Sequence, residues 1–281
     1  MLLLGNDAIA RGAIEAGVAI TTTYPGTPSS ELSLNFFQIA KESDLYFEYS
    51  VNEKVAMEVA AAASNCGLRT MCVMKHVGMN VASDTLITLA YLGVTGGMVI
   101  ISADDPFMFS SQNEQDNRYY GKLSGLTILE PSSVDEAKQM AIDAFDISET
   151  LQEPVILRTT TRINHSTGSV ELGPIKERIT QGHFEKDPQN KVAVPAVARK
   201  LHAKLLEKIE QAEGLANQSP YNFIEGSGEW GIICNGVSYN YVTDAIKELK
   251  IEDKIKVFRV GFIFNLQLFD GISDIIVADA I

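Results

Sequence analysis

Short apolar runs and longer amphipathic segments alternate over the first 160 residues of the chain. Runs rich in β-branched and aromatic residues predict strands, and apolar spacings of three and four residues between them predict helices. The expected strands cover residues 18–24, 46–49, 70–74, 98–102, 126–129 and 154–160, and the expected helices cover 6–16, 28–40, 51–66, 81–92 and 134–149. Alternation of this kind predicts an α/β fold with one doubly wound, mainly parallel sheet.

The pattern changes after Arg162. Residues 164–190 are polar and interrupted by prolines, residues 195–213 read as a charged helix with one apolar stripe, and residues 216–228 have the composition of a linker. A strand at 231–234, a helix at 239–249 and strands at 256–260 and 275–278 then predict a second, smaller α/β unit. We expect domains at 1–165 and 229–281 joined by 166–228. Because the sequence stops directly after a strand, we expect the second domain to be only partly present.

The segment 48–67, EYSVNEKVAMEVAAAASNCG, changes from a strand to a helix built of small residues. Val55 and Val59 recur at helical spacing and predict its buried face. Ser50 and Glu53 have the spacing of a capping box, in which each side chain bonds the other's backbone amide. Glu53 therefore has two interpretations: a capping glutamate, or a catalytic carboxylate at the carboxyl end of the preceding strand.

Several other segments are expected at the same edge of the sheet, which is where open α/β folds bind ligands. The turn from Tyr24 to Thr27 ends the first strand just before a helix, whose N-terminal amides can face an anion. A loop at 75–80 that contains His76 follows another strand, and the long polar loop 104–118 follows the next one. Together with Glu53, these segments predict a ligand crevice.

The overall composition narrows the classes of function. A net charge of −13 argues against nucleic acid or an anionic membrane as the main partner. Three unevenly spaced cysteines without a C-x2-C pair predict reduced thiols in a cytoplasm, and no thiolate metal site in this segment. The longest apolar run, 90–103, is too short to span a bilayer. No basic segment precedes the apolar start, so no signal peptide is expected.

A resemblance to a known family rests on six stretches of the chain: LLLGNDAIARGAIEAGV, YPGTPSSEL, YSVNEKVAMEVAAAAS, MKHVGMNVASDTL, ADDPFMFSSQNEQDNRYY and PVILRTTTRINHS. In combination they resemble the N-terminal portion of the alpha subunits of indolepyruvate ferredoxin oxidoreductases. These enzymes are a branch of the 2-oxoacid:ferredoxin oxidoreductases, which depend on thiamine diphosphate.

The resemblance implies roles for particular residues. The first domain would be a pyrimidine-type thiamine-diphosphate-binding domain, followed by a transketolase-C-like α/β domain. In such enzymes a glutamate that opens a helix of small residues contacts the aminopyrimidine ring, and this position is Glu53, which would be catalytic. The implied cofactor-binding residues are Tyr24, Pro25, Gly26, Glu53, His76, Gly78 and Asn80, and the implied substrate-binding residues are Thr27, Gln112 and Asn113.

The resemblance also implies an activity and partners. The reaction would be the oxidative decarboxylation of an arylpyruvate such as indolepyruvate to an aryl-acetyl-CoA, with electrons passed to ferredoxin. Mg²⁺ and [4Fe-4S] clusters are expected only from segments absent here. A beta subunit and self-association are expected as protein partners. Neither nucleic acid nor a membrane is expected as a partner. The alternatives are the same chemistry on another 2-oxoacid, a non-oxidative decarboxylation, or a truncated, non-catalytic partner subunit.

Overall fold

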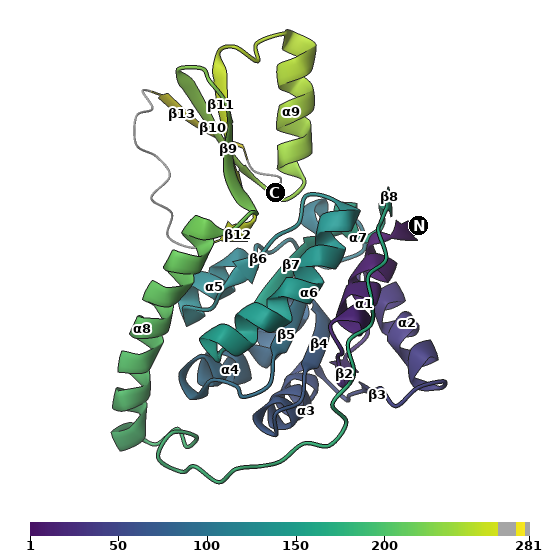
Figure 1. Cartoon of the computed structure of the whole chain (residues 1–281), viewed down its shortest axis with the longest axis vertical. Coiled ribbons are helices and arrows are strands. Elements are labelled where there is room, and N and C mark those ends of the chain that lie inside the picture. The colour runs from purple at the N-terminus through teal and green to yellow at the C-terminus, as the bar shows by residue number, and fades with distance from the viewer. Residues whose placement is uncertain (264–273, 279–281) are drawn as a thin grey trace.

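A seven-stranded sheet forms the centre of the larger unit in the computed structural model, which describes residues 1–263 and 274–278 (Figure 1). The strand order is β12-β6-β7-β5-β4-β2-β3, and every neighbouring pair is parallel except β12 with β6. The strands are β2 (Ile20–Thr23), β3 (Tyr46–Tyr49), β4 (Thr70–Lys75), β5 (Met98–Asp104), β6 (Ile128–Leu129), β7 (Val155–Thr160) and β12 (Phe262–Ile263). The predicted mainly parallel α/β fold is thereby confirmed.

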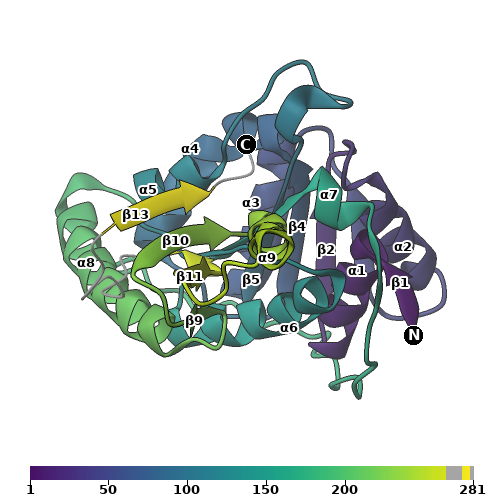
Figure 2. The ribbon, with the colours of Figure 1, turned by 90° about the horizontal axis from the view of Figure 1, so that it is seen from above.

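Helices cover both faces of this sheet, as a doubly wound fold requires (Figure 2). The helices of the larger unit are α1 (Gly5–Glu15), α2 (Ser30–Ala40), α3 (Glu53–Asn65), α4 (His76–Leu92), α5 (Arg118–Ser124), α6 (Val134–Leu151) and α7 (Thr161–Asn164). Successive side chains of β4 point to opposite faces. Met71 and Val73 pack in the layer of α1, α2 and α6, whereas Cys72 and Met74 pack in the layer of α3 and α4.

Residues 167–218 bind along the outside of the larger unit. β8 (Thr167–Ser169) pairs antiparallel with β1 (Leu2–Leu4), a small sheet that the pattern did not predict. Further along, the Arg178 side chain donates to the Val18 carbonyl and the His183 N–H donates to the Cys66 carbonyl. α8 (Pro195–Gln218) then packs Leu205 into the apolar layer beside α4. The segment expected to join two domains is thus hydrogen-bonded and packed against the first.

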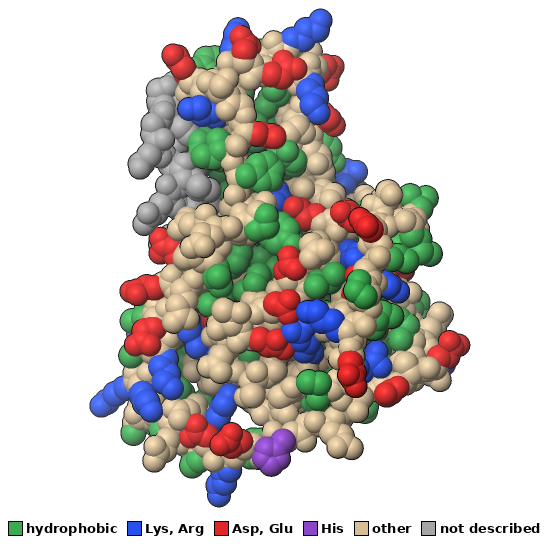
Figure 3. All heavy atoms as spheres, viewed as in Figure 1, with side chains coloured by type: hydrophobic (Ala, Val, Ile, Leu, Met, Phe, Trp, Pro, Cys, Tyr) green, Lys and Arg blue, Asp and Glu red, His purple; other side chains and the backbone are tan. Residues whose placement is uncertain are grey.

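The smaller unit is a four-stranded sheet of order β13-β10-β11-β9 with α9 (Ser238–Leu249) beside it. Its strands are β9 (Asn222–Gly226), β10 (Trp230–Asn235), β11 (Ile255–Val260) and β13 (Asp274–Ala278). β9 lies where the composition predicted a linker. Two side-chain amides attach this unit to the larger one, Asn235 to the Glu130 carboxylate at 2.9 Å and Asn240 to the Ser132 carbonyl at 2.7 Å. Figure 3 shows hydrophobic side chains gathered near this junction.

Besides α3, which begins at Glu53, three helix starts differ from the prediction. Asn6 lies inside α1 rather than capping it, because its amide donates to the Pro28 carbonyl at 2.8 Å. α2 begins at Ser30, two residues later than expected. α4 begins at His76, so residues 76–80 are helical and not a loop; Gly78 disfavours a helix locally by about 1 kcal/mol, and packing on α3 overrides it.

The structure contains a short helix that the sequence pattern did not predict. α5 was not predicted, because its short amphipathic pattern is too brief to signal a helix. Among the helices that the structure describes, none combines the length and the apolar character needed to cross a bilayer.

Candidate active site

Four parallel strands bring the expected site segments to one edge of the main sheet. The turn at residues 24–27 follows β2, α3 follows β3, α4 follows β4, and the loop at residues 105–117 follows β5. From β2 the chain moves outward to β3, whereas from β4 it moves the other way to β5. Such a reversal of strand order marks the usual ligand position in open α/β sheets.

Glu53 opens α3 and is not used as a helix cap. Asn52 is the N-cap, and its Oδ1 accepts the Val55 N–H at 3.0 Å. The Ser50 hydroxyl instead donates to the Glu48 carboxylate at 2.6 Å, so the expected capping box between Ser50 and Glu53 is wrong. The Glu53 side chain is only 8% exposed, and within residues 1–263 its carboxylate has no hydrogen-bond partner. A buried carboxylate without a partner is costly unless a ligand supplies one.

Gly78 lies directly against the Glu53 carboxyl group. A Cβ at position 78 would come within 2.6 Å of both Cγ and Oε1 of Glu53. The two residues belong to the first turns of α3 and α4, which pack closely because Ala56, Ala60 and Ala82 are buried between them. Val55 and Val59 are only half-buried, so the packed face of α3 is not the one that the valines predicted. The structure therefore brings together Glu53 and Gly78 from two separate predictions.

The turn after β2 lies beside the start of α4. A Cβ on Gly26 would meet the Lys75 side chain, with its Cδ at 2.8 Å, so the glycine permits this close approach. Tyr24 and Pro25 are exposed at the crest of the turn. Thr27 is half-buried, and within residues 1–263 its hydroxyl has no hydrogen-bond partner. Gly26 thus lies against the residue that precedes α4, and Tyr24, Pro25 and Thr27 belong to the same turn.

His76 fastens the loop that follows β5. Its ring is fully buried, with Nε2 at 3.0 Å from the Asn113 carbonyl oxygen. Because a carbonyl only accepts, Nε2 carries the proton and Nδ1 is left as an acceptor; no described residue donates to it. The amides of Gln115 and Asn117 both donate to the His76 carbonyl, at 3.1 and 3.0 Å. His76 therefore positions this loop over the start of α4.

Asn80 belongs to the same contact. Its side chain exchanges two hydrogen bonds with Gln115, both at 2.9 Å, and accepts a third from the Tyr120 hydroxyl at 2.6 Å. Gln112 and Asn113 are exposed on the loop, and within residues 1–263 their side chains make no hydrogen bond. No hydrogen bond within these residues joins either one to Thr27. The assignment of Thr27, Gln112 and Asn113 to the substrate stays a prediction.

The carboxylate of Asp105 organises the first half of the loop. It accepts hydrogen bonds from the Ser110 N–H at 2.8 Å, the Ser111 hydroxyl at 2.7 Å and the Thr161 hydroxyl at 2.8 Å. Burial opposes ionisation, but these donors together lower the pKa of Asp105. The loop thus has a fixed shape, although it is largely polar and lies at the surface.

Comparison with known proteins identifies the family. The model for the family described as "Pyruvate flavodoxin/ferredoxin oxidoreductase, thiamine diP-bdg" matches residues 11–204. The chain belongs to this family. Its relatives include the "Indolepyruvate oxidoreductase subunit IorA" of Thermococcus kodakarensis, 49% identical over 99% of this chain and 45% of the relative, and that of Archaeoglobus fulgidus, 51% identical over 89% of this chain and 41% of the relative. The chain therefore spans less than half the length of these relatives.

Solved structures agree on the fold of this oxidoreductase family member. The 2-oxoglutarate:ferredoxin oxidoreductase from Magnetococcus marinus superposes with a TM-score of 0.79 at 18% identity, covering 99% of this chain and 57% of that one. An inactive split-gene transketolase gives a TM-score of 0.61 at 14% identity, covering 99% and 79%. At these identities the likeness concerns the fold alone.

The aminopyrimidine half of thiamine diphosphate, the cofactor of this family, fits the residues present. A ring nitrogen needs a carboxyl group with a free oxygen, and Glu53 offers one that lies close against Gly78. The described residues offer no comparable site for a metal ion, because no cluster of three or more His, Cys, Asp or Glu side chains suited to a cation occurs among them. The origin of Mg²⁺ and of any iron–sulfur cluster stays a prediction.

A buried charge network behind the loop was missed from the sequence. Arg158, 2% exposed, pairs with Asp104 at 2.8 Å and with Glu130 at 2.6 Å. Burial alone would lower the pKa of Arg158, but the two carboxylates raise it, so the guanidinium stays charged. Asn117 links Asp104 to the His76 contact through its backbone N–H. A lone arginine in the apolar run PVILRTT was the available signal, since an unpaired charge would not be tolerated in a buried strand.

Proposed function

We propose that this chain supplies the aminopyrimidine-binding side of a thiamine-diphosphate-dependent oxidoreductase that oxidatively decarboxylates arylpyruvates such as indolepyruvate. The observation that carries the proposal is the buried, unpartnered Glu53 carboxylate seated on Gly78, in a chain of a thiamine-diphosphate-binding family. The aryl substrate is supported by relatives that are 44–51% identical and carry the name indolepyruvate oxidoreductase.

Glu53 would act by sharing a proton with a ring nitrogen. When bound, thiamine diphosphate supplies a carbon nucleophile that attacks the 2-oxo group of the substrate. Glu53 would hold a proton between one of its carboxyl oxygens and N1′ of the aminopyrimidine, which favours the tautomer that can remove the thiazolium proton. The apolar packing of α3 on α4 would place this carboxyl group at the edge of a low-dielectric layer, which strengthens its interaction with the ring.

The other residues would bind and orient. The turn formed by Tyr24, Pro25 and Gly26 would contact the cofactor from the side of β2, and Thr27 offers a free hydroxyl to a 2-oxoacid. His76 and Asn80 would act through the loop that they hold. Gln112 and Asn113, exposed in the free chain, would reach the substrate only if the loop moves or a partner covers it.

The rest of the machinery is proposed to lie outside this chain. Mg²⁺, the diphosphate site and [4Fe-4S] clusters would come from other segments or from a beta subunit, and CoA and ferredoxin would bind to the complete assembly, which we propose to be cytoplasmic and to self-associate. We expect the isolated chain to bind thiamine diphosphate weakly, because an aminopyrimidine alone offers a small area and a few hydrogen bonds. Titration calorimetry with Mg²⁺ checks this, and micromolar binding would contradict it.

The decisive test is Glu53→Gln in the complete enzyme. The substituted amide keeps the size of the side chain but cannot share a proton, so turnover of indolepyruvate should fall at least about 100-fold while the melting temperature stays near that of the parent. Glu58→Gln, on the exposed side of the same helix, is the matched control and should leave turnover unchanged. Near-normal turnover of Glu53→Gln at saturating cofactor would remove Glu53 from the mechanism.

The same experiment addresses the alternatives. If the parent oxidises 2-oxoglutarate or pyruvate faster than indolepyruvate, the chemistry stands and the aryl preference falls. If the assembly is active and Glu53→Gln has no effect, a non-catalytic partner role for this chain is favoured. Exposed Phe107 and Phe109 on the loop after β5 favour the aryl substrate over both.

A further inference from the structure

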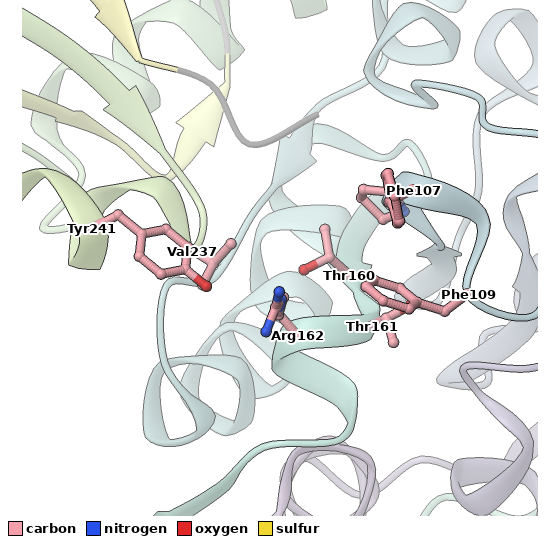
Figure 4. Close-up of a pocket in the computed structure, with 8 residues that line it drawn as sticks. Phe107, Phe109, Thr160, Thr161, Arg162, Val237 and Tyr241 are labelled. Atoms are coloured by element: carbon pink, nitrogen blue, oxygen red, sulfur yellow. The ribbon is translucent and has the colours of Figure 1, made fainter.

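A cavity of about 480 Å³ opens between the carboxyl edge of the main sheet and the smaller unit (Figure 4). Three parts of the chain line it: the loop after β5, the end of β7 with the first residues of α7, and the start of α9. The side chains that matter are Phe107, Phe109, Thr160, Arg162, Val237 and Tyr241. The volume lies in the range of sites for small molecules.

The two phenylalanines are exposed on a strained turn. Phe107 is 74% exposed and Phe109 is 59% exposed, with their rings tilted against each other at 5.7 Å. Phe107 and Met108 have φ values of +65° and +54°, a left-handed conformation that side chains other than glycine adopt at an energetic cost. The turn is held by hydrogen bonds, including the Phe107 N–H to the Glu114 carboxylate at 2.8 Å. A strained turn that keeps two rings at the mouth of a cavity points to a ligand that covers them.

The polar groups of the cavity match one negative charge. The Arg162 guanidinium lies 5.9 Å from the centre of the Phe109 ring, and it forms no ion pair within residues 1–263. Thr160 is buried, and its hydroxyl, which Figure 4 draws on the side of Arg162, has no hydrogen-bond partner among the described residues. Asp105 does not compete for Arg162, because donors from the loop and from Thr161 already surround its carboxylate.

We propose that this cavity binds a small aromatic monocarboxylate. Its ring would lie among Phe107, Phe109 and Tyr241, and its carboxylate would pair with Arg162 and accept from the Thr160 hydroxyl. A polyanion such as a nucleotide fits poorly, because Arg162 is the single cation that the described part of the chain contributes to the lining, and the chain carries a net charge of −13. The class of ligand rests on the proposed function, and because the readout is binding and not turnover, this inference can fail while the proposed function stands.

Titration calorimetry of this chain with indole-3-acetate tests the proposal. A ligand of this size at typical efficiency should bind with a dissociation constant of roughly 0.1–1 mM. Neutral indole-3-acetamide, which has the same shape, should bind at least about tenfold more weakly because it lacks the charge. Absence of measurable binding at about 10 mM ligand, well above the expected dissociation constant, or equal affinity for the acid and the amide, overturns the proposal.

Variants place the ligand in the cavity. Arg162→Met and Tyr241→Ala should each weaken binding of indole-3-acetate by about tenfold, whereas Arg199→Met, an exposed arginine on α8, should not change it. Unchanged affinity in Arg162→Met overturns the assignment. Titration with indole-3-pyruvate shows whether the cavity prefers a 2-oxoacid. An affinity for indole-3-pyruvate within about threefold of that for indole-3-acetate indicates a site for simple aryl carboxylates. An affinity more than about tenfold higher indicates a site for the 2-oxoacid.

Phe107→Gly separates a ligand role from a role in holding the loop. Glycine adopts the positive φ without strain, and the ring buries little, so the melting temperature should rise by about 2 °C. Binding of indole-3-acetate should weaken at the same time by about threefold or more. A lower melting temperature with unchanged binding would show that the ring only anchors the loop.

Discussion

At the scale of single residues, the candidate site depends on one contact between two helix starts. Gly78 has no side chain, and the Glu53 carboxyl group fills the space that a Cβ would take. The Glu53 carboxyl group therefore lies against the backbone of α4, and it makes no hydrogen bond within residues 1–263. Glycine is unfavourable inside a helix, and at this position it leaves the room that the Glu53 carboxyl group occupies.

Gly78→Ala should separate activity from stability. The added methyl group gains about 1 kcal/mol of helix propensity, but it displaces the Glu53 carboxyl group, which is flexible enough to move. We expect a free energy of unfolding within about 1 kcal/mol of the parent and a turnover at least about tenfold lower in the complete enzyme. Urea unfolding and steady-state kinetics measure the two effects.

Gly214→Ala is the matched control. Gly214 lies in α8, and a Cβ there would meet no atom within 4 Å. This variant should be more stable by about 1 kcal/mol and equally active. If Gly78→Ala kept full turnover, the close contact with Glu53 would have no role in catalysis.

At the scale of elements, α3 is started by Asn52 and not by Ser50. The Asn52 side chain accepts the Val55 N–H, and Ser50 is engaged with Glu48 instead. The distinction matters for function, because a capping box would have used the Glu53 carboxylate for the helix. With Asn52 as the cap, the acid is left for a ligand.

Asn52→Ala should lower the free energy of unfolding by about 1 kcal/mol, since the first turn of α3 loses a hydrogen bond at a backbone N–H. Asn52→Asp keeps an acceptor oxygen and should stay within about 0.5 kcal/mol of the parent. Guanidinium unfolding followed by circular dichroism gives both values. Equal stability of the alanine variant and the parent would mean that another group caps the helix.

At the scale of the whole molecule, α8 is attached to the main sheet through a buried acid. Glu153, just before β7, is fully buried and accepts from the Thr127 hydroxyl at 3.2 Å, while its second oxygen has no partner among the described residues. Burial raises the pKa of Glu153 from 4.5 to about 7, although Lys208 of α8 acts in the opposite direction. Lys208 itself donates to the Gln152 carbonyl at 2.6 Å and so fixes α8 beside this acid.

The raised pKa predicts a loss of stability with pH. Below about pH 4.5 Glu153 is protonated in both the folded and unfolded chain, and above about pH 7 the folded chain must hold a buried charge. Glu153→Gln should therefore change stability little near pH 4.5 and raise it by about 2–3 kcal/mol at about pH 8. Urea unfolding at the two pH values checks this, and a variant that is less stable than the parent at the higher pH would contradict the sign.

The sequence by itself determined the order and type of most elements of the main sheet. Strands such as β4 and β5 were predictable because a continuous apolar run of strand length occurs where a parallel sheet buries both faces. The connection of each strand to a helix then placed the turn after β2, Glu53 and His76 at one edge of the sheet. Both predictions depend on the local periodicity of apolar residues and on the parallel direction of the strands, which short stretches of sequence indicate.

Only the tertiary structure decided which of these residues touch. The contact of Gly78 with Glu53 and the cavity between Arg162 and Tyr241 join residues 25 and 79 positions apart in the sequence. Helix spacing could not choose the buried face of α3, because nearly all of its positions are small or apolar, and the close approach of α4 selected Ala56 and Ala60. Local pattern indicates the type and order of the elements, whereas helix starts, buried faces and contacts between distant residues depend on how the elements pack.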